Sequence, residues 1–463
     1  MENISAHTID SFKRYHLIGI GGIGMSGIAR LLLRCGRQVS GSDLKESLNI
    51  GQLRSEGAKI FLGHRGENVV GADIVVYSSA IKEDNPEVQF ARVQGIPRIR
   101  RAQALAYLMR NKTVVTVAGS HGKTTTTSLA SHLFLQAGLQ PTVAIGGVLR
   151  NINANACFGE GDFFIAEADE SDGSFLWYHP TYSLITNIDR EHLDYYQTFE
   201  NEVQGFREFL GNTLEDGCVI GCVDDPVVRR LLLEYPFKKV RFGMNKDADI
   251  YPVQVRVEGF CSEFDCYLRG SFIDHFILSL GGVHNISNAL SVIALGLELG
   301  IDRDIIKKAL RSYQGAQRRL EVKFRDDRYS IIDDYAHHPT EIKATLSAVK
   351  QLNASRVVAV FQPHRFTRTQ LLFDEFAESF FDTDYLILTD IYPASEPPIV
   401  GVTAEKLYQR IRSKFPDKQI QYCAKEEVVA LLLRIREPGD VIITLGAGDI
   451  VKICEELVEE FAR

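Results

Sequence analysis

Two glycine-rich loops, about a hundred residues apart, constrain this chain more than any other feature. The first, residues 19–24 (Gly-Ile-Gly-Gly-Ile-Gly), follows a strand-like run, and so does the second, residues 119–124 (Gly-Ser-His-Gly-Lys-Thr). A Gly-x-Gly-x-x-Gly loop lets the backbone N–H groups at a helix start approach a pyrophosphate. A Gly-Lys-Thr loop holds a nucleoside triphosphate, with lysine on the phosphates and threonine on Mg²⁺. The pair therefore predicts a protein that joins a nucleotide-linked substrate to ATP chemistry.

Length and composition are typical of a globular protein with several domains. The chain has 463 residues, 45% of them hydrophobic and 24% charged. At about 150 residues per domain this predicts three domains, each with its own core. A net charge of −8 without any Lys/Arg-rich run argues against nucleic-acid binding. Because the first residues do not resemble a signal peptide and no apolar run approaches the about 20 residues that cross a membrane, we expect a cytoplasmic protein without membrane insertion.

Strand and helix signals alternate along almost the whole chain, which predicts parallel α/β domains. Strands are predicted at residues 15–20, 38–41, 74–77, 113–117, 162–167, 182–186, 329–332, 356–361, 385–389 and 441–445. Helices are predicted at residues 25–35, 124–136, 288–299, 339–352 and 373–381. Residues 239–280 carry short alternating runs that predict a small antiparallel sheet. A domain boundary is expected near residues 313–319.

The first loop, taken alone, favours a dinucleotide. Asp43 lies 19 residues after Gly24, at the end of the second predicted strand. That is where a dinucleotide-binding fold places the acid that binds ribose. NAD is one ligand that fits, another nucleotide is a second, and a tight turn without a ligand is a third. Nothing downstream supplies a hydride-transfer site, which argues against a dehydrogenase. The second loop, which indicates ATP, argues against a dehydrogenase as well.

The second loop departs from the Walker pattern in one place. Val117 occupies the position of the first glycine, and the loop's own first glycine is Gly119. A strand, a Gly-x-x-Gly-Lys-Thr turn and a helix-forming stretch nevertheless follow in the expected order. We therefore expect Lys123 to neutralise the β- and γ-phosphates and Thr124 to bind Mg²⁺.

Further polar residues follow other buried strands. Glu167 ends such a strand and is predicted to bind a metal, whereas most other acids of residues 167–172 are expected to be solvated. His192 follows another buried strand, where a single histidine is more often structural than a ligand. In the last third, Arg365 and Arg368 form a potential carboxylate clamp, the alternative being a salt-bridged loop that caps a helix.

In this order, the motifs resemble those of the Mur ligases. The resemblance rests on the first loop, residues 118–127 (Ala-Gly-Ser-His-Gly-Lys-Thr-Thr-Thr-Thr), 167–172 (Glu-Ala-Asp-Glu-Ser-Asp), 282–289 (Gly-Val-His-Asn-Ile-Ser-Asn-Ala), 334–339 (Asp-Tyr-Ala-His-His-Pro) and the loop of Arg365 and Arg368. It covers essentially the whole chain. Ser120 stands where many members carry Thr or Asn, a change that keeps a small polar residue.

The resemblance implies an α/β fold of three domains. These are an N-terminal Rossmann-like domain for the UDP-sugar (1–110), a central P-loop-type mononucleotide-binding domain for ATP and Mg²⁺ or Mn²⁺ (111–316), and a C-terminal Rossmann-like domain for the amino acid (317–463). The implied activity is ATP-dependent ligation of L-alanine to the carboxylate of UDP-N-acetylmuramate through an acyl phosphate, in peptidoglycan synthesis. The pyrophosphate at the first loop then belongs to UDP rather than to NAD.

Three alternatives are carried beside this activity. A related ligase would join a murein tripeptide to the same sugar nucleotide during cell-wall recycling. An NAD-dependent oxidoreductase and a non-catalytic nucleotide-binding switch belong to other classes. The oligomeric state is left open, and a monomer–dimer equilibrium is one of the alternatives.

The resemblance also implies roles for individual residues. The residues implied in catalysis are Lys123, Arg318 and His337. Those implied in ATP binding are Gly119, Ser120, His121, Gly122, Lys123, Thr124, Thr125, His284, Asn285, Asn288, Arg318 and Asp334. Those implied in binding the UDP-sugar are Gly21, Gly22, Gly24, Ser42, Asp43, His64 and Ser79. Those implied in binding the amino acid are Tyr335, His337, Arg365 and Arg368, and the implied metal ligands are Thr124, Glu167 and His192.

Overall fold

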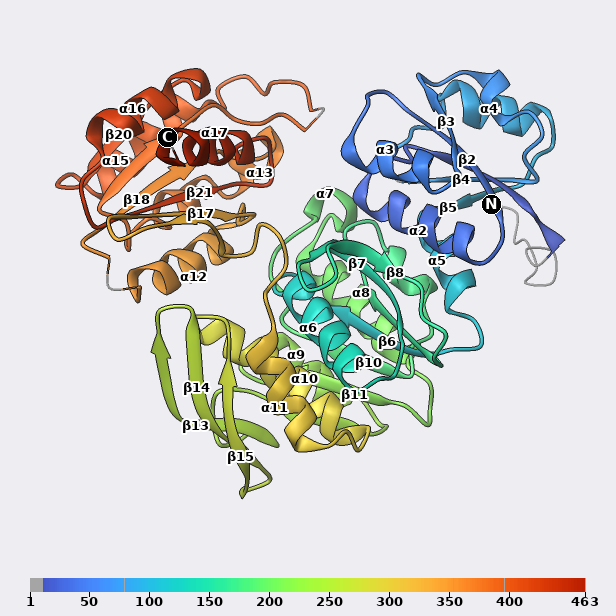
Figure 1. Cartoon of the computed structure of the whole chain (residues 1–463), viewed down its shortest axis with the longest axis horizontal. Helices are drawn as coiled ribbons and strands as arrows, with labels where there is room; N and C mark the ends of the chain where they lie inside the picture. The colour runs from blue at the N-terminus through green and yellow to red at the C-terminus, as the bar shows by residue number, and fades with distance from the viewer. Residues whose placement is uncertain (1–10, 79, 353, 395, 463) are drawn as a thin grey trace. The chain divides into compact units, whose positions relative to one another are not determined.

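The computed structural model describes residues 11–78, 80–352, 354–394 and 396–462. It contains three β-sheets, of five, ten and six strands, which follow one another along the chain (Figure 1). Contacts divide the chain into two compact units. Unit 1 comprises residues up to 253 together with 265–276 and 287–314, and unit 2 comprises 254–264, 277–286 and 315–463. Within the described ranges, none of the helices combines the length and apolar character that crossing a bilayer requires.

The N-terminal sheet is parallel and has the order β3-β2-β1-β4-β5. Its strands are β1 (Arg14–Ile18), β2 (Gln38–Asp43), β3 (Lys59–Leu62), β4 (Ile74–Tyr77) and β5 (Arg98–Arg100). Its helices are α2 (Ile23–Arg34), α3 (Leu48–Ser55), the 3₁₀ turn η1 (Gly66–Val69), α4 (Pro86–Val93) and α5 (Arg101–Met109). The strand order reverses beside β1, which is where ligands bind in doubly wound sheets. The first glycine loop leaves the sheet at this point.

The ten-stranded sheet has the order β15-β14-β13-β12-β11-β10-β6-β9-β7-β8. Its strands are β6 (Thr113–Ala118), β7 (Thr142–Leu149), β8 (Ala154–Cys157), β9 (Phe163–Glu167), β10 (Tyr182–Ile185), β11 (Cys218–Cys222), β12 (Lys239–Phe242), β13 (Ile250–Glu258), β14 (Cys261–Leu268) and β15 (Ser271–Leu278). Its helical segments are α6 (Lys123–Gln136), η2 (Ser174–Trp177), α7 (Leu193–Tyr196), α8 (Phe199–Gly211), α9 (Pro226–Glu234), α10 (Val283–Glu298) and α11 (Arg303–Ser312). Strand β6 lies between β9 and β10, so the second glycine loop opens between two neighbouring strand ends.

The small antiparallel sheet predicted over residues 239–280 forms not as a sheet of its own but as part of the ten-stranded sheet. Strand β12 pairs in parallel with β11, and β13 continues from β12 at the pair Phe242–Ile250. Two-residue connections then join β13 to β14 and β14 to β15, which is the geometry of antiparallel hairpins. The alternating sequence pattern correctly indicates hairpins. These hairpins extend the central sheet, because the backbone groups at the edge of that sheet are available for pairing.

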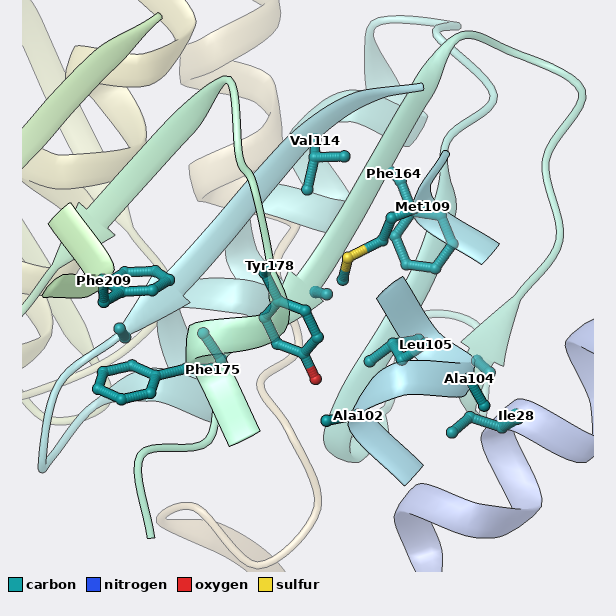
Figure 2. Packing of buried hydrophobic residues seen from close by; sticks show 14 of the residues in the cluster. Ile28, Ala102, Ala104, Leu105, Met109, Val114, Phe164, Phe175, Tyr178 and Phe209 are labelled. Atoms are coloured by element: carbon teal, nitrogen blue, oxygen red, sulfur yellow. The ribbon is translucent and has the colours of Figure 1, made fainter. Parts of the chain in front are cut away.

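The N-terminal and central domains share one hydrophobic cluster, contrary to the expectation of one core per domain. Figure 2 shows Ile28 of α2 beside Ala104 of α5, and Met109 at the end of the same helix beside Phe164 of the central sheet. All belong to a single cluster of buried side chains, which continues to Tyr178 and beyond. Burial of apolar surface across the boundary near residue 110 therefore joins the first two domains into one unit.

The C-terminal sheet has the order β16-β17-β21-β18-β19-β20, with only β16 antiparallel to its neighbour. Its strands are β16 (Glu321–Arg325), β17 (Tyr329–Asp334), β18 (Arg356–Phe361), β19 (Tyr385–Leu388), β20 (Gln419–Tyr422) and β21 (Asp440–Leu445). Its helical segments are α12 (Pro339–Lys350), α13 (Phe366–Leu371), α14 (Phe373–Ala377), α15 (Ala404–Lys414), η3 (Lys425–Glu427), α16 (Val428–Ile435) and α17 (Val451–Ala462). Two separate clusters of buried side chains involve α12, α14 and α15 on the one hand and α16 and α17 on the other. This is the doubly wound arrangement that the sequence predicts.

Candidate active site

The first glycine loop connects β1 to α2 and is held by the end of β2. The N–H groups of Gly19 and Ile20 donate to the carbonyl oxygen of Ser42, at 2.8 and 3.1 Å. The N–H of Gly21 donates to Oδ2 of Asp43 at 2.9 Å. A Cβ on Gly21 would lie 2.9 Å from that same oxygen, so this approach requires glycine. The loop and the end of β2 therefore form one fixed edge.

Residues predicted for the UDP-sugar meet along this edge. The hydroxyl of Ser42 lies 2.9 Å from Nδ1 of His64. The second carboxylate oxygen of Asp43 accepts a hydrogen bond from the N–H of Leu44 at 2.7 Å, so backbone amides engage both of its oxygens. The structure thus brings Ser42, Asp43 and His64 beside Gly21, and it places Asp43 in a role that orders the loop.

The remaining members of this set lie at the start of α2. Gly22 precedes the helix as its N-cap residue. Gly24 faces the guanidinium of Arg101, because a Cβ at Gly24 would lie 3.0 Å from its Nη1. Arg101 in turn pairs with Asp169 at 2.9 Å, which links the first loop to the acidic segment of the central domain. Ser79 lies outside the described residues.

The second loop connects β6 to α6 and lies against the segment that follows β10. The N–H of Ser120 donates to the carbonyl oxygen of Asn187 at 3.0 Å, and the N–H of His121 donates to the Asn187 side chain at 2.8 Å. The hydroxyl of Thr186 donates to the carbonyl oxygen of His121 at 2.6 Å. Gly119 has φ +127°, and a Cβ there would clash with Thr186. The loop conformation is therefore fixed by glycine and by a neighbouring strand end.

Lys123 places a buried ammonium group at the start of α6. Its Nζ donates to the carbonyl oxygens of Gly119 and Ser120, at 2.6 and 3.1 Å, and pairs with Oε1 of Glu170 at 2.7 Å. Burial lowers the pKa of Lys123, but the charge of Glu170 and of two further glutamates outweighs it, and the pKa is raised. The loop therefore carries a permanent positive charge where a phosphate chain is expected.

Helix α10 carries three residues predicted for the adenine side of ATP. Asn288 lies against the second loop, since a Cβ on Gly122 would come 2.6 Å from its Oδ1. His284 and Asn285 belong to unit 2. There the Asn285 amide donates to the carbonyl oxygen of Gly281 at 2.8 Å, and burial lowers the pKa of His284 to about 4. Thr125 is buried within α6.

Thr124 and Glu167 meet as the sequence predicts. The Thr124 hydroxyl donates to Oε2 of Glu167 at 3.0 Å, and the N–H of Gly146 donates to the same oxygen at 3.0 Å. Hydroxyl and carboxylate oxygens are hard ligands of the kind that Mg²⁺ and Mn²⁺ take. This pair therefore fits a divalent cation next to the phosphate loop.

His192 lies with two other acids. Its Nε2 is 3.6 Å from Oε1 of Glu170 and 3.5 Å from Oε2 of Glu191, and the three side chains offer ligand atoms within 4.8 Å of one another. Glu170 is fully buried, and it is thus an exception to the expectation that most acids of this segment are solvated. Its Oε2 is buried and accepts no hydrogen bond from the residues that the structure describes. An oxygen in that position fits a cation ligand.

The residues predicted for the amino acid gather around His364 in unit 2. The ring of His337 lies 5.4 Å from that of Tyr335 and 5.7 Å from that of His364. Nη1 of Arg368 lies 3.5 Å from Nδ1 of His364. Burial, together with the neighbouring His337 and arginines, lowers the pKa of His364 to about 3. Arg365 lies at the loop's edge, 3.9 Å from a carboxylate oxygen of Glu396.

Arg318 and Asp334 are both engaged inside unit 2. Nε of Arg318 donates to Asp333 at 2.9 Å, and Nη2 donates to the carbonyl oxygen of Gly446 at 2.6 Å. Asp334 accepts hydrogen bonds from the N–H groups of Leu320 and Ala336, at 2.6 and 2.8 Å. Burial raises the pKa of Asp334 to about 6 against the opposing effect of these bonds. The predicted contacts of both residues with ATP stay predictions.

Similarity to known proteins covers nearly the whole chain. It is 43% identical over 452 residues to UDP-N-acetylmuramate–L-alanine ligase of Aquifex aeolicus (97% of this chain, 98% of the relative), and 46% identical over 452 residues to the enzyme of that name from Geotalea daltonii, with the same coverage. The crystal structure of UDP-N-acetylmuramate–alanine ligase from Thermotoga maritima superposes with a TM-score of 0.84 at 28% identity, covering 97% of this chain and 99% of that one.

Three family models match in chain order. The models described as Mur ligase family, catalytic domain, Mur ligase middle domain, and Mur ligase, glutamate ligase domain match residues 14–113, 117–296 and 318–448. The chain belongs to the Mur ligase family. The resemblance stated from the motifs is thereby confirmed, as is the three-domain α/β architecture of this Mur ligase.

Sequence reasoning missed several residues of this Mur ligase. Glu170 and Glu191 lie beside the predicted metal ligand His192. They belong to the segments that follow β9 and β10, and both are buried in the structure. His364 joins the predicted amino-acid residues and is next in sequence to Arg365, which was a usable signal. Glu87, which contacts Ser42, gave no signal of this kind, because it stands after Asn85 and Pro86 and so indicates only a helix start.

Proposed function

We propose that this chain catalyses the ATP-dependent ligation of L-alanine to UDP-N-acetylmuramate, giving UDP-N-acetylmuramoyl-L-alanine, ADP and phosphate. The observation that carries the proposal is 43–46% identity, over nearly all of both chains, to relatives named for this reaction. A murein peptide ligase from Psychrobacter arcticus has a similar structure, with 22% identity and a TM-score of 0.72. A likeness at this identity shows a shared fold and does not indicate that this chain uses a murein peptide. The class is therefore an amide-forming, ADP-forming ligase, and the proposed cosubstrate is ATP with Mg²⁺ or Mn²⁺.

The chemistry requires activation of a carboxylate, because an oxide ion does not leave a carbonyl carbon. A carboxylate oxygen of the muramoyl group attacks the γ-phosphorus of ATP, the bond from that phosphorus to the bridging oxygen breaks, and ADP leaves. The alanine nitrogen then attacks the acyl phosphate carbonyl, and phosphate leaves from the tetrahedral intermediate. Alanine enters as an ammonium ion, so its nitrogen loses one proton before it attacks and a second as the amide forms, and His337, of the pair with His338, is the proposed base.

The central domain supplies the charge that this first step needs. Lys123 is proposed to contact the β- and γ-phosphates, and the Thr124 hydroxyl with Glu167 and His192 to hold the divalent cation. When bound, that cation would offset the negative charge of the two anions that react. The loop residues Gly119, Ser120, His121 and Gly122 would surround the phosphates, while the N–H groups of Ser120 and His121 stay on Asn187 and hold the loop in place.

The other two domains are proposed to bring the partners of the reaction. The N-terminal domain (1–110) would bind UDP-N-acetylmuramate through the first loop, and the central domain (111–316) would bind ATP. The C-terminal domain (317–463) would bind L-alanine. Arg365 and Arg368 would contact the carboxylate of the alanine, with Tyr335 nearby. Arg318, Asp334, His284 and Asn285 are proposed on the ATP side. Because ATP and nucleotide-linked sugars are made in the cytoplasm, the reaction is assigned there. A monomer–dimer equilibrium stays a prediction that sedimentation would test.

The test is phosphate release from ATP by the purified chain with Mg²⁺, UDP-N-acetylmuramate and L-alanine, with each component omitted in turn. The proposal expects release only in the complete mixture and a UDP-muramoyl-alanine product by mass. Release that needs a murein tripeptide and ignores alanine would assign the recycling reaction instead. ATP hydrolysis that is indifferent to both acceptors would contradict a ligase, and NADH binding to the first loop would favour the oxidoreductase.

A further inference from the structure

Glu87 is a fully buried carboxylate beside the first loop that no step of the proposed reaction uses. It is the second residue of α4. Its Oε1 accepts hydrogen bonds from the N–H of Arg65 and the amide of Asn68, at 3.2 and 2.6 Å. Its Oε2 accepts one from the Ser42 hydroxyl at 2.5 Å and lies 3.4 Å from Nε2 of His16. Four donors thus meet the four lone-pair positions of one carboxylate.

The environment keeps Glu87 ionised. Burial alone would raise its pKa, but the hydrogen bonds from His16, Ser42 and Asn68 outweigh burial, and the pKa of Glu87 is lowered. An ionised carboxylate has no proton and can only accept hydrogen bonds. Each of the four groups around Glu87 must therefore direct a hydrogen toward it, and the amide of Asn68 gives its other hydrogen to the carbonyl oxygen of Gly63.

This fixes a chain of protons that ends at His64. Ser42 has one hydroxyl proton, and that proton goes to Oε2 of Glu87. The 2.9 Å contact between the Ser42 oxygen and Nδ1 of His64 then requires the proton to lie on Nδ1. Oε2 of Glu87, 3.6 Å from the same nitrogen, favours the same arrangement. In the neutral ring the other nitrogen, Nε2, is consequently an acceptor.

Nε2 of His64 is open to a ligand. The contacts of the His64 ring with other residues in the described ranges are made by Nδ1, and the side chain is 12% exposed. His64 follows β3 by two residues, and the sheet order from the centre outward is β1, β2, β3 (Figure 1). In a fold of this kind the loop after β1 takes the pyrophosphate and the acid at the end of β2 lies near the ribose. Strand β3 is the next strand outward and ends near His64. By this order, His64 lies on the side of the sheet where the base of the nucleotide would bind.

We propose that Glu87 is a positioning residue for base recognition: through Ser42 it holds the proton of His64 on Nδ1, so that Nε2 accepts a hydrogen bond from N3–H of uracil. Uracil carries a donor at N3, whereas cytosine carries an acceptor there, so an acceptor in the protein selects uridine nucleotides. The proposal rests on the N-terminal domain binding UDP-N-acetylmuramate, as proposed above.

The test uses UDP and CDP alone as probes, titrated into the full chain by calorimetry. The wild type is expected to bind UDP at least about tenfold more tightly than CDP, as one well-placed hydrogen bond allows. In Glu87→Gln the proton of Ser42 is no longer fixed, and we expect UDP affinity to fall about tenfold and the UDP preference to fall to about threefold or less. Glu67→Gln, an exposed acid in the neighbouring turn η1, is the matched control and should bind as the wild type does.

A second readout separates positioning from a purely structural role. The ¹⁵N shifts of the His64 ring are expected to show Nδ1–H in the wild type and a loss of that single tautomer in Glu87→Gln. A wild-type ring protonated at Nε2 would overturn the proposal, and so would a folded Glu87→Gln that binds UDP and CDP more weakly by the same factor. Ser42→Ala removes the same relay and replaces Glu87→Gln if that variant does not fold.

The two proposals fail differently. Binding of neither nucleotide to the wild type would overturn the assignment of the first domain to a uridine nucleotide, whatever the tautomer of His64. Binding of UDP and CDP with equal affinity would overturn only the part given to Glu87.

Discussion

The two glycine loops are alike in backbone and opposite in chemistry. Each leaves a central parallel strand, turns at glycines with positive φ, and opens a helix, α2 or α6. At the first loop, an acid, Asp43, engages a backbone N–H of the loop itself. At the second, Lys123 lies over the loop's own carbonyl oxygens and next to Glu170. The first loop can bind a diphosphate that does not react, whereas the second is equipped for a phosphoryl group that moves.

Each loop also has a fully buried glutamate nearby, and these two acids behave in opposite ways. Glu87, near the first loop, receives hydrogen bonds that lower its pKa. Glu202 of α8 lies near Glu170, the partner of Lys123, and accepts no hydrogen bond from a side chain of the described residues; the backbone N–H of Glu191, which donates to the carbonyl oxygen of Asp189, has only a smaller effect on it. Burial, followed by the charges of Glu170 and Glu191, raises the pKa of Glu202 to about 9. Both are 0% exposed, so the difference in their pKa comes from their surroundings, which are hydrogen-bond donors around Glu87 and other carboxylates around Glu202.

The largest expected effect separates the loops by function. Lys123→Met should lower kcat by about 10³-fold, because a positive charge on the transferred phosphoryl group is lost at a water-poor site. Affinity for UDP, measured by calorimetry, should change by less than about twofold, since the first loop is independent of this charge. Lys246→Met, an exposed lysine in the same domain, is the control. A comparable loss of UDP affinity in Lys123→Met would contradict the division of work between the loops.

The next effect separates the loops by backbone. Gly119→Ala puts a Cβ against Thr186 at φ +127°, whereas Gly22→Ala puts one in ordinary contact, 3.5 Å from the carbonyl oxygen of Gly19. The first substitution should cost about 3 kcal/mol of unfolding free energy, and the second less than about 1 kcal/mol. Urea unfolding of both variants measures this. Equal losses would show that the glycines of the two loops serve the same purpose.

Local sequence patterns were sufficient for much of this comparison. The strand at Ile74–Tyr77 and the strand at Arg356–Phe361 have the bounds predicted from their apolar runs. The helices after both loops begin within two residues of their predicted starts. These features depend on neighbours in sequence, such as a glycine before an apolar stretch. The pairing of Thr124 with Glu167 also followed, because Glu167 ends β9 and Thr124 begins the helix after the loop that leaves the neighbouring strand β6.

Local patterns could not predict contacts between residues that are far apart in the sequence and that folding brings together. Glu87 lies 45 residues from Ser42, and nothing near either residue marks the contact. The joint core of the first two domains depends on Ile28 and Phe164 facing the same cluster, although each looks like an ordinary core residue of its own domain. In the sequence Glu170 is one acid of a polar segment, and its fully buried position follows only from the structure.

The smallest effect tests the two buried acids directly. Glu202 keeps its proton in the folded chain to about pH 9, whereas in the unfolded chain it loses the proton near its ordinary pKa of 4.5. The unfolded state therefore binds fewer protons between these values, and the contribution of Glu202 to stability falls as pH rises through that window. Glu202→Gln removes this dependence and should raise the unfolding free energy at pH 7 by roughly 2 kcal/mol, with no gain below about pH 4.5. Glu87→Gln should do the reverse and lower stability at neutral pH, since the pKa of Glu87 is lowered. Exposed Glu200, two residues from Glu202 in α8, gives the control Glu200→Gln. A loss of stability in Glu202→Gln at pH 7 would mean that Glu202 is ionised and paired like Glu87, and the contrast between the two acids would fail.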